Sequence, residues 1–145
     1  MLNSRFKVLT LLFLFFLMIS SCSKDTSNEP ENLISGRIRF TNTSYYSIVL
    51  NYMTQTRGSQ SETRNLGSTV AGGSGPAGRF DLTNIFDGGF IFPGGDQVLV
   101  EFQSIAPSND NPNIPLFRRT VILTVNGTQN VQVKGQNGDY DIGGN

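Results

Sequence analysis

The sequence predicts an all-β protein, a single β-sandwich of about seven short strands that follows a signal peptide. After Leu33, apolar and polar residues alternate with a period of two in several segments, and no segment shows a convincing helical period. Gly, Pro and Asn residues separate these segments as turns. The 145-residue chain is long enough for one domain with its own core once a leader is set aside.

Residues 1–21 are expected to be the signal peptide. Arg5 and Lys7 make a short basic start, and residues 8–19 are almost entirely apolar. A membrane-spanning helix needs about 20 apolar residues. The shorter run is instead typical of the apolar core of a secretory leader that is removed.

The leader ends with Ile19-Ser20-Ser21-Cys22, which contains the only cysteine of the chain. These residues resemble the lipobox of bacterial lipoproteins, in which an aliphatic and two small residues precede an obligatory cysteine. The resemblance implies cleavage before Cys22 and acylation of its thiol. Several acyl chains on one residue anchor firmly, since each buried CH₂ contributes about 0.8 kcal/mol. The alternative is an ordinary cysteine, with a signal peptidase that cleaves after Ser23.

Residues 22–32 are expected to be a flexible tether, because they are polar, contain a proline and show no apolar pattern. In the lipoprotein family, a serine such as Ser23 directly after the cysteine implies transfer to the outer membrane. Asp25, Glu29 and Glu31 partly resemble acidic tags that direct some lipoproteins to the cell surface. We therefore expect an outer-membrane location, with exposure on the cell surface as a further expectation.

The composition limits the chemistry of the mature chain. The formal net charge is zero, and loss of Arg5 and Lys7 with the leader leaves a mildly acidic chain, which argues against a nucleic-acid partner. The sequence has no histidine, so Ser-His-Asp and Cys-His nucleophiles cannot be assembled. A zinc site is not expected either, because zinc is usually bound by Cys and His and the sequence has one cysteine and no histidine. We expect no cofactor and no enzymatic activity.

The predicted domain spans residues 33–135 and begins with two alternating segments. In residues 34–41 and 46–52 the apolar side chains fall on even positions. Because a shared register turns both sets toward one face, we expect these segments to pair as a hairpin around the turn at residues 42–44.

For the middle of the chain the sequence predicts long loops as well as strands. Residues 55–78 are polar and glycine-rich, so we expect a long loop with a short strand near 66–70. Alternating patterns predict strands at 79–85 and 97–103. A loop with three prolines follows at 106–115.

The last two strands are predicted at 117–125 and 130–135, on either side of an Asn-Gly turn. A two-residue loop would place core side chains opposite polar ones. A three-residue loop at 126–128 instead sets Leu123 opposite Val131, so we expect a hairpin loop of odd length.

Three stretches, "GRIRF", "SIVLNY" and "GRFDLTNIFDGG", resemble the strand pattern of transthyretin-like modules of the carboxypeptidase-regulatory type. The similarity extends over about residues 34–102. It implies a transthyretin-like or Ig-like sandwich and a noncatalytic role as a spacer or binding domain.

The first candidate binding residues are Phe86, Phe90 and Phe92, which lie between glycines that permit tight turns. As an exposed loop they would dock a glycan, a peptide or another protein, because aromatic residues are enriched at contact sites. Alternatively they cap the open end of the core, and this is the interpretation that we favour.

Charged side chains give three further hypotheses. A carboxylate hydrolase would need two acids about 5–10 Å apart in a cleft. An anion-binding stripe would need the arginines of two segments on neighbouring strands, and a Ca²⁺ site would need six or more oxygens. The acid candidates are Asp81, Asp87, Asp96 and Glu101, the stripe candidates are Arg37, Arg39, Arg118 and Arg119, and the Ca²⁺ candidates are Asp139 and Asp141.

Simpler alternatives exist for all three. Asp81 and Glu101 are predicted on outward strand faces, where solvation explains them, and arginines on strand faces are commonly solvated. Residues 136–145 are expected to be a polar C-terminal tail, so we expect no bound metal.

The sequence thus predicts an outer-membrane lipoprotein, held in the membrane by acylated Cys22, with a noncatalytic β-sandwich as an accessory or binding module of the envelope. One alternative is a surface receptor that binds glycan or peptide through the loop of residues 86–92, and another is the carboxylate hydrolase. The expected partners are the membrane and a protein or glycan.

Overall fold

The computed structural model describes residues 32–73, 75, 78–105, 113 and 115–144. The predicted signal peptide, Cys22 and nearly all of the tether lie outside the described residues, as does most of the predicted loop at 106–115. Within the described residues, no helix has the length and apolar character to cross a membrane. Asn32–Asn145 is one compact unit.

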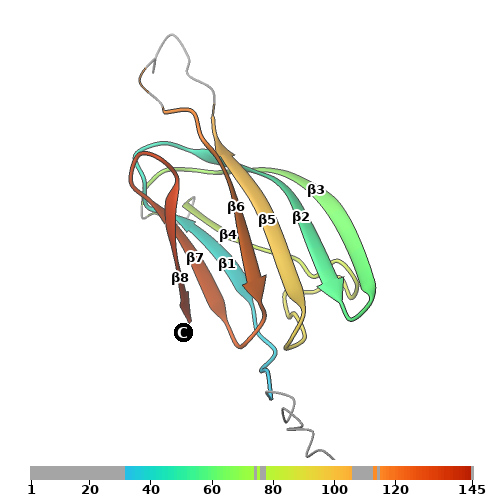
Figure 1. Ribbon diagram of the computed structural model, residues 1–145. Coiled ribbons are helices and arrows are strands. Elements are labelled where there is room, and N and C mark those ends of the chain that lie inside the picture. Colours follow the sequence, from blue (N-terminus) through green and yellow to red (C-terminus); the bar gives the residue numbers. More distant parts are fainter. Residues whose placement is uncertain (1–31, 74, 76–77, 106–112, 114, 145) are drawn as a thin grey trace, which may run out of the picture. The chain divides into compact units, whose positions relative to one another are not determined.

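Eight strands form two packed sheets (Figure 1). The strands are β1 (Ile38–Asn42), β2 (Ile48–Arg57), β3 (Gln60–Val70), β4 (Arg79–Asp81), β5 (Gln97–Ser104), β6 (Arg118–Thr124), β7 (Gln129–Lys134) and β8 (Asp139–Gly144). One sheet has the order β4-β1-β7-β8 and the other β3-β2-β5-β6. The predicted class, an all-β single sandwich, is confirmed, with eight strands where about seven were expected.

The core lies between the sheets and uses the inward positions of the alternating strands. Its fully buried members include Ile38, Phe40, Leu50, Val98, Val100, Phe102, Val121, Val131 and Val133. The Phe102 ring makes edge-on contacts with Phe40 and Tyr140 of the opposite sheet, each with 6.0 Å between ring centroids. Such aromatic pairs contribute about 0.5–1.5 kcal/mol beyond the buried area.

The predicted hairpin between residues 34–41 and 46–52 is wrong. β1 lies between β4, which is antiparallel to it, and β7, which is parallel, whereas β2 belongs to the other sheet. Two strands in opposite sheets of a sandwich bury alternate side chains between the sheets, just as two hydrogen-bonded strands of one sheet do. The apolar pattern therefore predicted the buried faces correctly but could not distinguish facing from pairing.

The chain crosses from one sheet to the other after Asn42, the last residue of β1. At this crossover the Asn42 side chain forms hydrogen bonds with the backbone. Its buried side-chain Nδ2 donates to the carbonyl oxygens of Tyr46, at 2.8 Å, and Val70, at 3.1 Å. Its Oδ1 accepts a hydrogen bond from the Ser44 hydroxyl. A buried amide with these partners fixes the crossover, since buried polar groups are costly unless they are hydrogen-bonded.

The last predicted hairpin is also wrong. β6 pairs with β5, and β7 pairs with β1 and β8, so residues 126–128 join two sheets instead of two paired strands. Leu123 and Val131 are both buried, as predicted, but they enter the core from opposite sides.

Two segments predicted as irregular are strands. β2 continues to Arg57 and turns at Gly58, whose φ of +58° favours glycine, into the long strand β3. β3 is an edge strand with most side chains exposed, so no apolar alternation marks it. The predicted tail at 136–145 likewise contains β8, which pairs with β7, so the domain boundary at residue 135 is corrected to include this strand.

Candidate functional site

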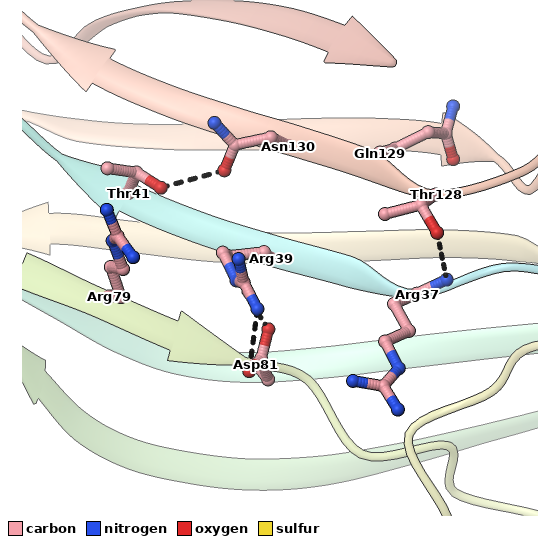
Figure 2. Close-up of a pocket in the computed structure, with 8 residues that line it drawn as sticks. All are labelled: Arg37, Arg39, Thr41, Arg79, Asp81, Thr128, Gln129 and Asn130. Carbon is pink, nitrogen blue, oxygen red and sulfur yellow. Dashed lines mark hydrogen bonds and ion pairs between the residues drawn. The ribbon is translucent and has the colours of Figure 1, made fainter. Parts of the chain in front are cut away.

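A shallow depression of about 430 Å³ lies on the outer face of the β4-β1-β7-β8 sheet (Figure 2). β1 turns Ile38 and Phe40 into the core, so Arg39 and Thr41 between and beyond them point outward. The other lining residues belong to β4, to β7 and to the positions just before β1 and β7. The depression is lined by Arg37, Arg39, Thr41, Arg79, Asp81, Thr128, Gln129 and Asn130.

Arg39 and Asp81 form a cross-strand ion pair in the depression. The register of β1 and β4 places these residues opposite each other. Arg39 Nε lies 2.7 Å from Asp81 Oδ1, and its Nη2 donates to Oδ2 at 3.3 Å. The hydrogen bond and charge of Asp81 raise the pKa of Arg39. Because both side chains are about one-third exposed, the pair contributes only about 0.2–1 kcal/mol to stability.

Arg37 and Arg79 have exposed side chains at the same depression. Within the described part of the chain, neither guanidinium forms an ion pair. The backbone N–H of Arg37 donates to Thr128 Oγ1 at 3.4 Å, a contact that joins the start of β1 to the start of β7. Three arginines against one aspartate make the depression locally cationic on a chain whose formal net charge is zero.

Hydrogen-bonding side chains line the β7 side of the depression. Thr41 Oγ1 donates to Asn130 Oδ1 at 2.8 Å, which leaves the amide N–H groups of Asn130 as donors. Gln129 Nε2 donates to the Thr124 carbonyl oxygen at 3.2 Å. The buried Gln129 Oε1 has no hydrogen-bond partner among the described residues.

The predicted arginine stripe is wrong in its composition. Arg37 and Arg39 do lie together, but Arg118 and Arg119 belong to β6 in the other sheet. The third arginine of the depression, Arg79, was missed by the sequence prediction. Its position depends on the pairing of β4 with β1, which local alternation does not reveal.

The three candidate phenylalanines have different environments. Phe92 is fully buried, and its backbone exchanges two hydrogen bonds with Gly36, at 3.0 and 2.8 Å. Phe86 is half-buried and lies under the Arg57 guanidinium, 4.9 Å from ring centroid to Cζ. Phe90 is 51% exposed. Phe92 therefore belongs to the core, whereas Phe90 faces solvent.

Arg57 holds the phenylalanine-containing loop against the end of β2. Its Nε lies 3.0 Å from Oδ2 of Asp96, whose side chain is only 4% exposed, and its Nη2 lies 2.7 Å from Asp87 Oδ2. Gln55 Nε2 also donates to Asp96 Oδ2, at 2.6 Å. Hydrogen bonds first from Arg57 and then from Asn84 lower the pKa of Asp87, and the contacts with Asp87 and Asp96 raise that of Arg57.

The remaining acidic candidates are not arranged as a catalytic pair or a metal centre. Glu101 accepts a hydrogen bond from Asn51 Nδ2 at 2.9 Å and lies 3.6 Å from Arg118 Nε. The Ca²⁺ candidate Asp141 forms an ion pair with Lys134 across β7 and β8, while Asp139 is exposed. Among the described residues, no cluster of three or more Cys, Asp or Glu side chains has the geometry of a metal site.

No protein-family model matches the sequence, and no curated protein matches it. Among solved structures, an NMR structure of a protein from Eubacterium rectale is similar at 13% sequence identity, over 81% of this chain and 92% of that one. Its TM-score is 0.33, which is too low to support an inference about this chain.

Proposed function

We propose that this chain is a lipid-anchored protein of the bacterial outer membrane, acylated at Cys22, with a β-sandwich that serves as a noncatalytic binding module of the envelope. The observation that carries the proposal is the Ile19-Ser20-Ser21-Cys22 sequence at the end of a basic and then apolar leader. The compact domain begins at Asn32, ten residues after this cysteine, which supports a division into anchor, tether and module.

The ion pairs of the domain support a noncatalytic role. Asp81 is paired with Arg39, and Asp87 and Asp96 share Arg57, so each of these carboxylates forms an ion pair with an arginine. A carboxylate hydrolase instead needs one acid with a raised pKa beside a second one. The hydrolase alternative predicts that replacing these acids by amides abolishes an activity against a glycoside.

Mass spectrometry of the membrane-extracted protein tests the anchor. The wild-type chain should begin at Cys22 and carry acyl groups, whereas Cys22→Ala should lose the acyl mass and leave the membrane fraction. A wild-type chain that begins at Lys24 without acyl groups would contradict the proposal.

Protease treatment of intact cells then tests the side of the membrane. Degradation of the acylated protein by external protease is expected if the module faces the cell exterior. Protection until the outer membrane is permeabilised would place the module in the periplasm and retain the anchor.

A second candidate function is a receptor that uses the loop of residues 86–92. The observation that favours it is the adjacent exposure of Phe90, at 51%, and Ile91, at 52%. Phe90→Ser should then lower binding to a panel of soluble glycans and peptides without changing the melting temperature. Unchanged binding by this variant would exclude the loop as the site.

A further inference from the structure

We propose that the arginine-lined depression binds acidic oligosaccharides, chains of sugar units that carry carboxylate or sulfate groups. This inference deepens the binding role proposed above and rests on it, but it does not depend on acylation of Cys22. It is supported by the order of the arginines, by the polar lining and by the absence of apolar side chains from that lining.

The arginines form a row along the face of the sheet. Arg79 pairs with Thr41, and Asp81 pairs with Arg39, so along β1 the guanidinium-bearing positions follow at intervals of two residues. Figure 2 shows Arg79, Arg39 and Arg37 in this order. Two residues of strand span roughly 6–7 Å. A row with this spacing suits a ligand with several anionic groups along its length better than a single small anion.

The end positions of the row have the capacity to bind anions. Asp81 already accepts from Arg39, while Arg37 and Arg79 form no ion pair within the described residues. A guanidinium presents a planar fork of donors that matches carboxylate and sulfate oxygens at two points. We infer that Arg37 and Arg79 contact two charged units, with the Arg39–Asp81 pair between them.

The rest of the lining favours a hydroxylated ligand. Thr41, Thr128 and Asn130 offer hydroxyl and amide groups that both donate and accept hydrogen bonds. None of the eight lining residues has an aliphatic or aromatic side chain. A ligand that fills the depression therefore meets charged and hydrogen-bonding groups and no aliphatic or aromatic side chain, which is the recognition chemistry of an acidic sugar chain.

Two other polyanions fit this lining less well. Single-stranded nucleic acid is bound by aromatic side chains on which bases stack, and the lining contains none. Peripheral membrane surfaces insert apolar side chains among the lipids, and the lining lacks these as well. The acidic oligosaccharide is the polyanion that requires neither.

Binding measurements on the full chain in a nonionic detergent test the inference. Isothermal titration with oligogalacturonate and with sulfated dextran oligosaccharides should show binding, and neutral dextran should show none. The affinity for the acidic probes should fall as NaCl is added, because salt screens exposed charges. Arg37→Ala/Arg79→Ala should weaken binding roughly tenfold or more, as expected for the loss of two charge-assisted contacts.

Arg118→Ala/Arg119→Ala is the matched control. It removes the same charge from exposed positions of β6, on the other sheet, and should keep the affinity within about twofold of wild type. Both double variants should melt near the wild-type temperature, since the replaced side chains are exposed.

Three results would overturn the inference. The first is a folded wild-type chain that binds neither acidic probe, and the second is an equal loss of affinity in both double variants, which would show nonspecific attraction. The third is binding to phosphatidylglycerol vesicles that requires Arg37 and Arg79 while the saccharides do not bind. Mass spectrometry of the same preparation reports acylation separately, so failure of this inference and failure of the lipid anchor are distinguishable.

Discussion

Replacement of Phe92 by alanine should destabilise the domain strongly, whereas the same change at Phe90 should have little effect. Phe92 has an exposed fraction of 0%, and Phe90, two residues earlier, is 51% exposed. Removal of a fully buried phenylalanine ring costs about 3–5 kcal/mol, because the transfer free energy is lost and a cavity remains. A half-exposed ring that leaves no cavity should change the free energy of unfolding by about 0.5 kcal/mol.

These free energies convert to clearly separated melting temperatures. For a domain the size of Asn32–Asn145, each kcal/mol lowers the melting temperature by about 3–6 °C. Phe92→Ala should therefore melt about 9–30 °C below wild type, and Phe90→Ala within a few degrees of it. The backbone contacts of Phe92 with Gly36 survive the substitution, so the measured loss reports the ring itself.

Thermal melts followed by circular dichroism, with urea titration as a second measure, give the comparison. A melting temperature for Phe92→Ala within about 3 °C of wild type would refute the placement of this ring in the core. Equal losses for both variants would refute the different environments of the two rings, and the loop would then act as one structural unit.

Three further predictions concern the ion pairs and the last strand. Arg57→Met should cost about 2–4 kcal/mol of unfolding free energy in urea titration, because the buried Asp96 loses its cation, whereas Arg64→Met on exposed β3 should change little. Since the folded-state pKa of Asp87 is lowered, its stabilisation is complete above its ordinary value near 3.8 and is lost as the pH falls through the folded value. The stability advantage of wild type over Asp87→Asn should therefore shrink below about pH 4 in melts at stepped pH, and an advantage that grows there would contradict this. Tyr140→Ala should cost about 1–3 kcal/mol of unfolding free energy in the same titration, because its ring packs on the core. A neutral effect would contradict this packing and favour the predicted polar tail at residues 136–145.

The faces of the strands could be predicted from the sequence, but their partners could not. The alternation in residues 97–103 predicts one face for Val98, Val100 and Phe102, and all three are buried. Burial follows from alternation within a few residues, so a short window contains the signal. Pairing is decided by contacts between segments up to about ninety residues apart, as in Phe40 and Val131, and no local pattern records these.

The strands that escaped prediction are those in which alternation is weakest. β3 lies at an edge and exposes most of both faces, and β8 has a half-buried Tyr140 and an exposed Ile142 among glycines and aspartates. Such strands are held mainly by hydrogen bonds to the backbone of one neighbouring strand. Their sequences therefore resemble those of loops.

The candidate site was predicted in part. The sequence placed Arg37 and Arg39 on one outward strand face, and the structure adds Arg79 through the register of β4. The sequence does not distinguish Phe90 from Phe92, because both are aromatic and lie close together in the chain. Their opposite exposure follows from the pairing of Phe92 with Gly36, a contact across more than fifty residues. Acylation of Cys22 and the similarity to transthyretin-like modules stay predictions.

The parallel pairing of β1 with β7 has a consequence for the order in which the chain emerges during synthesis. β1 is made first among the strands, yet one of its two neighbours, β7, begins at Gln129, and the other, β4, has only three residues. Until residues 129–133 have left the ribosome, β1 lacks the partner that covers its full length. Pairings with such large sequence separation form slowly. A chain that cannot close its first sheet early stays unfolded for longer, and the proposed transport to the outer membrane would require that state.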